Sequence, residues 1–530
     1  MKNQMKDFRD KFALGDFAAA QTILAKSELK KDKKSVLLWH LENGTLDLAM
    51  NNLDGAIVNF SRSLELIDQL YTTKLASKAA SLLINDASDE FYGASYERSY
   101  AHYFLSKAYY LRYLTSGNKL DLQGARGTIL AWDTYFADLQ RSGTKTLYTT
   151  DLMLKVFGGQ VHEVSEIRND KQISLQLYKD ALNILEGQSG ILSLFNKKSV
   201  EYIKSYEAEK KKPADKLYER TAAYNDLKDF LHFKILAVTR EIRSTDFDNQ
   251  VKALKPADEV KKKAMGPKTN VVLVMEEGFI PPKLGRPFNF GIRGAMGSVK
   301  DSGAKTFIAT VGVEAVTLFA MNKLGMVPTQ TASTGSFLFA HDVTRLAVQE
   351  AAIEFELPMI ENVPLVQRLE VFILNDQGVV VNHLPLPVIN ENGDLARVVL
   401  EEDVVSRYVK TGTRVAVRHL GAIVTAMVLY QRIKGVSEGS DFLAKSAAMA
   451  TYVGAAKGLS MLERADTRHW TTLPQAFRMA EVSLKPGLYK VGIASYSGDT
   501  VPKAPTKLLG DIVVNNSGKS LHTLRFNQNN

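Results

Sequence analysis

The sequence predicts a multidomain protein: an all-α N-terminal half built from helical repeats, and an α+β C-terminal half ending in an antiparallel β-sandwich-like unit. Three observations predict this fold class. None of the 15 prolines precedes Pro213, small and aromatic residues recur at a helical-repeat spacing, and the apolar period becomes that of strands after about residue 269. A chain of 530 residues with 45% hydrophobic content suffices for two or three domains with buried cores.

Proline sets the predicted domain boundaries. Because proline costs about 3 kcal/mol inside a helix, its absence before Pro213 predicts continuous helix packing over residues 1–245. Residues 246–268 are polar and lysine-rich and contain two prolines, which is typical of a linker. Residues 269–530 are the predicted α+β domain, with the β-sandwich-like unit at about 478–530.

Part of the N-terminal half is similar to tetratricopeptide repeats. Ala20 and Ala56 lie about 36 residues apart, close to the roughly 34-residue period of that repeat. Gly44 precedes Ala56 and Phe60 follows it, so small residues would let paired helices approach while the ring fills the groove between them. An ordinary helical bundle is the alternative. The small–aromatic–small pattern returns at Ser174, Tyr178 and Ala181.

An aromatic helix is predicted in the middle of this half. Tyr96, Tyr100 and Tyr103 share one helix face. Their rings are expected to pack in the core between helices. A surface that binds a partner or a sugar is the alternative, so these three tyrosines are candidate structural or partner-binding residues. The last helix of this half is expected over about residues 222–242, with Leu227, Leu231, Ile235 and Val238 as its buried stripe.

The C-terminal half contains strand signals separated by turn residues. Val271–Met275 is a continuous apolar run, and residues 365–374 and 379–381 flank an Asn-Asp-Gln-Gly turn that predicts a hairpin. Further strands are expected at 481–484, 489–494, 511–514 and 521–526. Helices are expected at about 342–356, 403–433 and 440–462. This mixture indicates an α+β domain.

The residues predict no catalytic group, no cofactor and no metal site. There is no cysteine, and none of the nine histidines stands in a metal-binding spacing. Neither a phosphate-binding loop nor a nucleophile elbow occurs. Glu276 and Glu277 would point to opposite faces of a strand, so they are poor partners for acid–base chemistry and are expected at a solvated strand end.

One cluster stands out near residue 470. Asp466, Arg468 and Trp470 lie just before Leu473-Pro474. We expect a structural corner in which Trp470 is buried and Arg468 is paired with a carboxylate. A partner or anion site at these three residues is the alternative.

Three stretches of the sequence carry a family resemblance: Phe91–Arg98 with the aromatic helix that follows to Tyr113, Val272–Lys283, and Ala465–Pro474. They are similar to a family of largely uncharacterised bacterial envelope lipoproteins with an N-terminal tetratricopeptide-like domain. The resemblance covers about residues 10–500, and its Asp-Thr-Arg-x-Trp element is the most specific part. It implies export, lipidation on an N-terminal cysteine and membrane attachment facing the periplasm. Because this sequence has no cysteine, a cytoplasmic location is the alternative.

These observations favour a non-enzymatic scaffold or adaptor of the bacterial cell envelope. Stacked helical repeats offer a surface for other envelope proteins or for self-association. The alternative is an envelope hydrolase or carbohydrate-acting enzyme with a site between the two halves. The net charge of +9 is mild for this length, and the lysine clusters carry no interleaved aromatics, so nucleic acid is not an expected partner.

Overall fold

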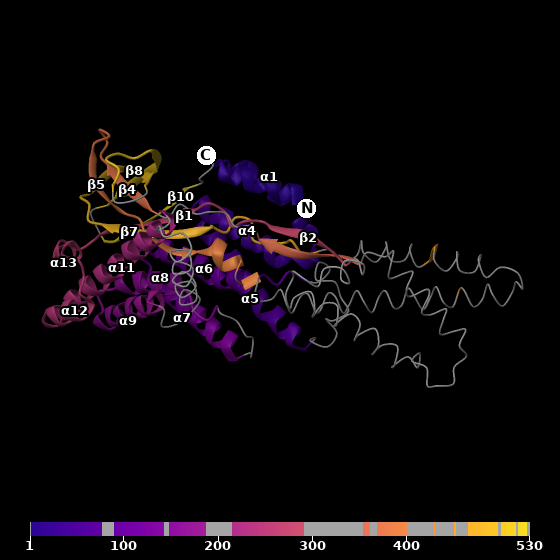
Figure 1. Ribbon diagram of the computed structural model, residues 1–530, viewed down its shortest axis with the longest axis horizontal. Helices are drawn as coiled ribbons and strands as arrows, with labels where there is room; N and C mark the ends of the chain where they lie inside the picture. The colour runs from indigo at the N-terminus through magenta and orange to yellow at the C-terminus, as the bar shows by residue number, and fades with distance from the viewer. Residues whose placement is uncertain are drawn as a thin grey trace, which may run out of the picture.

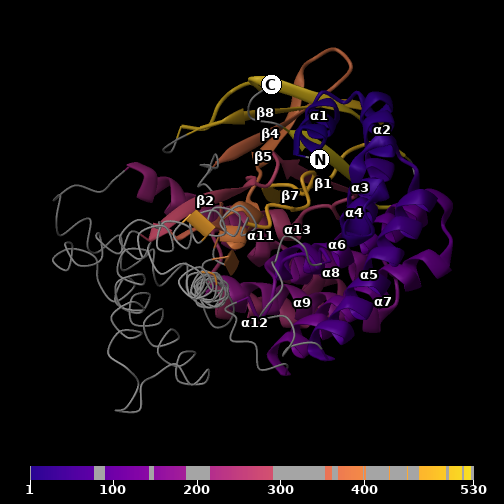
Figure 2. The same ribbon diagram turned by 90° about the vertical axis from the view of Figure 1, so that its right-hand side faces the viewer.

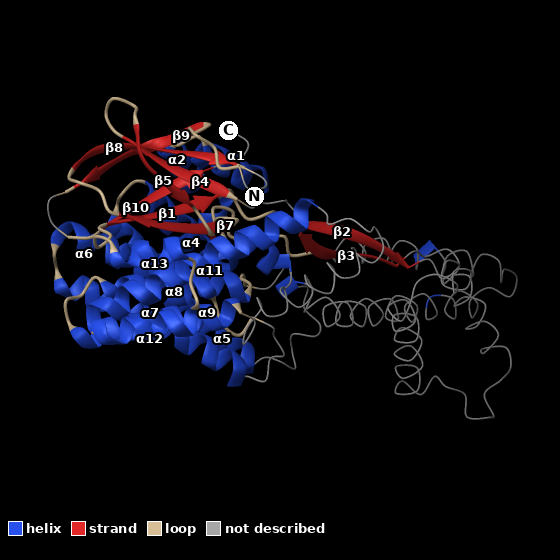
Figure 3. Cartoon of the chain, turned by 60° about the vertical axis from the view of Figure 1, so that its left-hand side comes forward, coloured by secondary structure: helices blue, strands red, loops and turns tan. Residues whose placement is uncertain are grey.

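The structure is a computed structural model that places a layer of helices against two stacked β-sheets (Figure 1 and Figure 3). No helix in the described part of the chain has the length and apolar character that crossing a membrane requires. The structure describes residues 2–76, 90–141, 148–186, 215–290, 353–360, 368–397, 399–400, 429, 450–451, 465–496, 500–515 and 518–526.

The helical half is confirmed: within the described ranges, every regular element before residue 245 is a helix. Asp16 and Asp151 cap α2 and α8 by accepting backbone N–H groups with their carboxylates. The helices are α1 Lys2–Ala13, α2 Phe17–Lys26, α3 Glu28–Lys31, α4 Val36–Ala49, α5 Leu53–Ala76, α6 Ser95–Ser116, α7 Lys119–Arg141, α8 Leu152–Glu163, α9 Arg168–Leu185 and α11 Asp215–Ile242.

The segment predicted as a linker, 246–268, contains two further helices, α12 Phe247–Leu254 and α13 Asp258–Met265. Phe247, Val260 and Ala264 are buried in a small core with Phe233 and Leu236 of α11. The lysines of this segment give it the composition of a linker, but one apolar side chain of α12 and two of α13 pack it against the last long helix.

The first sheet has four strands in the order β10-β1-β7-β6. β1 pairs in parallel with β10 and antiparallel with β7, and β6 closes the other edge. Strands from both ends of the C-terminal half therefore meet on β1. Their bounds are β1 Val271–Glu277, β6 Val388–Glu391, β7 Ala476–Val482 and β10 Ser520–Phe526.

The second four-stranded sheet has the order β5-β4-β8-β9. The predicted hairpin around Asn375–Gly378 is confirmed as β4 and β5. The turns after β7 and β9 instead carry the chain from one sheet to the other, so residues 478–530 do not form a unit of their own. The bounds are β4 Leu369–Leu374, β5 Val380–Pro385, β8 Gly487–Ser495 and β9 Lys507–Val514.

A two-stranded ribbon, β2 Lys283–Phe290 and β3 Ile353–Ile360, extends from the body (Figure 1). The helix predicted at 342–356 is wrong for its last four residues, because they lie in β3. Ile353, Phe355 and Leu357 alternate with glutamates, which is a strand period rather than a helical one. The other two predicted helices fall almost wholly outside the described residues.

The first sheet is buried on both faces. Val272, Val274 and Phe477 belong to the same apolar core as the helices. Leu273 and Val482 belong to a second core shared with the other sheet. At the edge, α1 lies beside α2 (Figure 2), and the guanidinium of Arg525 of β10 lies 4.8 Å from the centre of the Phe12 ring of α1.

Gly44 of α4 and Gly127 of α7 should respond in opposite ways to alanine. A Cβ at Gly44 would lie 2.8 Å from the ring of Phe60, whereas nothing lies within 4 Å of one at Gly127. Gly127→Ala should therefore raise the free energy of unfolding by about 0.5–1 kcal/mol. Gly44→Ala should lower it by about 1–3 kcal/mol, because Phe60 is fully buried. Denaturant melts measure both, and stabilisation by Gly44→Ala would contradict the close contact.

Candidate functional site

The most unusual chemistry of this molecule lies between the helices and the first sheet, where several charged side chains are almost completely buried. Buried charges are uncommon unless they are paired. We describe them as a four-residue ion cluster (Glu163, Lys234, Glu481 and Lys519), a pair of strand glutamates and the Trp470 turn (residues 466–473).

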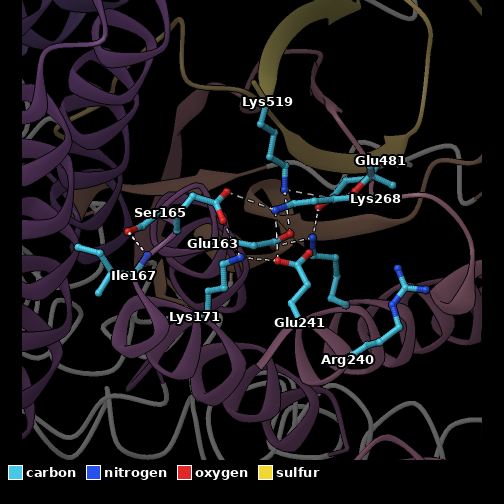
Figure 4. Close-up of polar contacts among 12 residues, drawn as sticks. Glu163, Ser165, Ile167, Lys171, Arg240, Glu241, Lys268, Glu481 and Lys519 are labelled. Carbon is cyan, nitrogen blue, oxygen red and sulfur yellow. Dashed lines mark hydrogen bonds and ion pairs between the residues drawn. The ribbon is translucent and has the colours of Figure 1, made fainter. Parts of the chain in front are cut away.

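The four-residue ion cluster joins α8 and α11 to the sheet (Figure 4). The Nζ of Lys234 lies 2.6 Å from Glu163 and 2.5 Å from Glu481. Lys519, just before β10, lies 3.1 Å and 3.5 Å from the same two carboxylates. Tyr178 donates a hydrogen bond to Glu163, and Thr269 donates one to Glu481. Two positive charges are thus balanced by two negative ones.

Both carboxylates of this cluster are ionised at neutral pH. Burial alone would raise the pKa of Glu163, but attraction to Lys234 and Lys519 outweighs burial and holds that pKa well below its ordinary value. The pKa of Glu481 is lowered against its burial by the same lysines. A carboxylate held in this state cannot supply a proton near neutral pH, so the cluster acts as an electrostatic lock between helices and sheet.

A partly exposed network continues this cluster toward the surface (Figure 4). Lys171 of α9 lies 2.6 Å from Glu241 of α11, and Lys268 lies 3.2 Å from the same carboxylate. These contacts hold the end of the 246–268 segment against the helices. Exposed pairs of this kind contribute little each, so the buried lock carries the coupling between layers.

Glu276 and Glu277 are both buried, so the expectation that they occupy a solvated strand end is wrong. Glu276 faces the helices and lies 2.5 Å from Lys107 of α6. Glu277 lies 2.6 Å from Arg478 of β7, whose side chain is fully buried. The expected alternation of faces is present. The error came from treating two adjacent charges as a sign of solvent, whereas the strand runs on between two packed layers.

The Trp470 turn rests on the helices. Trp470 is fully buried, with its indole 5.2 Å from the ring of Phe104 of α6 and its Nε1 donating to Thr45 of α4. Arg468 forms a two-contact pair with Asp466, at 2.9 and 2.8 Å. The predicted burial of Trp470 and pairing of Arg468 are therefore both present. The turn packs on α4 and α6 and leads directly into β7.

The candidate tyrosines belong to the core. Tyr96, Tyr100 and Tyr103 are each at most 1% exposed, so the expected packing in the core is confirmed. The ring of Tyr100 stacks on Phe477 of β7 at 5.1 Å, and Tyr103 meets the same ring edge-on. The aromatic face of the helical half is thus covered by the chain's own sheet.

Two buried carboxyls at this interface, Glu42 and Asp151, form no ion pair with a cation in the described part of the chain. Glu42 of α4 accepts hydrogen bonds from Thr471 and Thr472, and burial raises its pKa to about 7. Asp151 accepts from Tyr148 and from Asn390 of β6, and burial raises its pKa to about 6. These two carboxyls exchange protons closer to neutral pH than ordinary acids do.

Glu42→Gln should become stabilising relative to wild type as the pH rises. A carboxyl whose pKa is raised by folding stabilises the fold most when protonated, and that contribution is lost as the pH rises through about 7. Glutamine does not titrate, so the variant keeps its stability over this range. Its free energy of unfolding, relative to that of wild type, should therefore increase by up to about 3 kcal/mol between about pH 4.5 and pH 8. Denaturant melts at both pH values measure it. Glu163→Gln is the control and should destabilise at the higher pH, and a pH-independent difference for Glu42→Gln would refute the assignment.

Five residues of these buried sites were not predicted from the sequence: Glu42, Glu163, Lys234, Glu481 and Lys519. Two of them left a usable signal. Lys234 interrupts the predicted apolar stripe of 222–242, and Glu481 stands in a strand that is otherwise mostly apolar. A lone charge inside an apolar element indicates a buried partner, but not which one.

Comparisons with known proteins give no relative: no protein-family model, curated protein or solved structure matches this chain. Among the described residues, no group of three or more His, Asp or Glu side chains is placed to hold a metal ion.

Proposed function

We propose that this protein is a non-enzymatic scaffold of the bacterial cell envelope that binds partner proteins through the surface of its helical repeats. The observation that carries the proposal is the docking of the Trp470 turn. A stretch without helix or strand lies on α4–α6 and is held there by Glu42, Glu97 and Thr45. A helical layer that holds an extended segment of its own chain has the chemistry to hold one from a partner.

The helix packing supports a tetratricopeptide-like repeat as the basis of this layer. Phe60 of α5 packs on Gly44 of α4, the two positions that the repeat spacing singles out. Tyr178 of α9 packs in the same way on Gly159 of α8. Ser174 of α9 also donates a hydrogen bond to the Gly159 carbonyl.

The two stacked sheets support a β-sandwich-like unit that is larger than the sequence suggests. Their shared core draws Leu273, Val371, Val491 and Ile512 from both sheets. In the proposed scaffold this unit fixes the inner face of the helices, and the outer face stays exposed for partners.

Three exposed apolar side chains lie on these helices. Val58 of α5 and Leu120 and Leu130 of α7 are each more than 60% exposed. Such residues at the surface of repeat helices suit a protein partner or a second copy of this chain. The envelope location, with attachment through an N-terminal lipid, is supported by the family resemblance alone. A cytoplasmic location is the alternative.

Partner capture from native membranes tests the proposal. Full-length protein carrying Leu120→Glu and Leu130→Glu should lose co-purifying partners that the wild type retains. The matched control carries Leu488→Glu and Val513→Glu, which change two exposed residues of the second sheet and should leave capture intact. Loss in the control alone would place the binding surface on the sheets. Equal capture by all three proteins would refute binding through the helical face.

A further inference from the structure

The Trp470 turn is buried although it forms neither helix nor strand. Residues 469–475 are all buried, and a buried loop must find partners for its backbone N–H groups. Two of these partners are carboxylates of the helices rather than neighbouring strands. Glu97 of α6 accepts from the backbone of Trp470 at 2.7 Å, and Glu42 of α4 accepts from that of Thr471 at 2.6 Å.

The side chains of the turn fill complementary positions on the same helices. The indole of Trp470 lies 5.9 Å from the ring of Phe60 and 5.2 Å from that of Phe104. The guanidinium of Arg468 donates to the hydroxyl of Ser35 at 3.3 Å and lies 5.8 Å from the ring of Phe91. Backbone recognition by fixed side chains, with an aromatic anchor and a guanidinium contact, is how a protein binds an extended peptide.

Docking of the turn carries a cost that its release would relieve. Glu42 is buried and forms no ion pair within the described ranges, and burial raises its pKa. His469 is also buried, its Nε2 has no hydrogen-bond partner within the same ranges, and burial lowers its pKa to about 4. Lys107 and Arg525 each pair with Glu276, and Arg525 also donates a hydrogen bond to the carbonyl of Thr472 in the turn. The docked turn therefore gains hydrogen bonds and aromatic contacts but keeps two titratable groups, Glu42 and His469, away from water.

We propose that the Trp470 turn is a displaceable internal ligand, and that the surface it covers on α4–α6 binds an extended partner segment of the same chemistry. That segment would carry a guanidinium two residues before an indole, followed by hydroxyl side chains. The inference rests on the proposed scaffold function and adds to it a second, inner binding surface with its own class of partner. The turn then acts as an autoinhibitory contact that a partner must replace.

A labelled peptide with the sequence of residues 465–475 tests this inference on the full chain. Trp470→Ala should bind the peptide at least about tenfold more tightly than wild type, because the tethered turn of the wild type competes at a high effective concentration. Adding Thr45→Val should weaken that binding, and a peptide with alanine in place of its tryptophan should not bind. A folded Trp470→Ala chain that binds neither peptide, or both equally, would overturn the inference.

Amide hydrogen exchange on the wild type gives a second test that needs no variant. The amides of Trp470 and Thr471 should exchange at least about tenfold faster than those of Phe477 and Met479 in β7, because the turn opens without the sheet. Equal rates would mean that the turn opens only on global unfolding and would refute displacement. The peptide could fail to bind while partner capture still depends on the outer helical face. That result would refute this inference but not the proposed function.

Discussion

Lys234→Met should lower the free energy of unfolding by about 3–5 kcal/mol, as expected when one member of a buried ion cluster is removed. The variant leaves Glu163 and Glu481 buried with only Lys519 between them. One carboxyl must then take up a proton, so its pKa rises. The destabilisation should consequently be smaller near pH 4.5 than near pH 7.5, and denaturant melts at both pH values measure the difference.

Two further variants make this result specific. Lys228→Met removes a half-exposed lysine of the same helix that pairs with Glu186, and it should cost about 1 kcal/mol or less. Adding Glu481→Gln to Lys234→Met leaves one carboxylate and one lysine, so most of the loss should be recovered. If Lys234→Met costs no more than Lys228→Met, the ion cluster does not lock the layers together.

Trp470→Ala should cost about 3–5 kcal/mol, the usual range for a fully buried tryptophan. The indole packs against the stacked rings of Phe60 and Phe104 and donates to Thr45. Because these contacts lie on helices and the turn leads into β7, the helical half and the sheets should lose stability together. A single thermal transition shifted downward is the expected calorimetric result.

Trp39→Ala is the matched control for this variant. Trp39 of α4 is only partly buried, so its truncation should cost clearly less than that of Trp470. Two separate transitions in Trp470→Ala, with the helical one unchanged, would show that the halves are independent domains. A wild-type melting temperature for Trp470→Ala would refute the structural role of the turn.

Local patterns in the sequence determined much of the secondary structure. The absence of proline before Pro213 and the helical spacing of small and aromatic residues predicted the helical half. The apolar run at Val271–Met275 predicted β1. The Asn375–Gly378 turn predicted the β4–β5 hairpin. Tyr100 and Trp470 were correctly expected in the core, because large aromatic side chains at helical spacing or at a tight corner gain most from burial.

The tertiary structure alone decided which strands pair and where the charges lie. Val271 pairs with Ser520 on one side and Val482 on the other, and an apolar period identifies a strand without naming its neighbour. Lys234 and Glu481 each place a single charge in an apolar element, and only the packing of α11 against β7 shows that the two charges pair. The energy of an ion pair depends on the distance between its charges and on their burial. Both are set by the tertiary structure, because the paired residues lie far apart in the sequence.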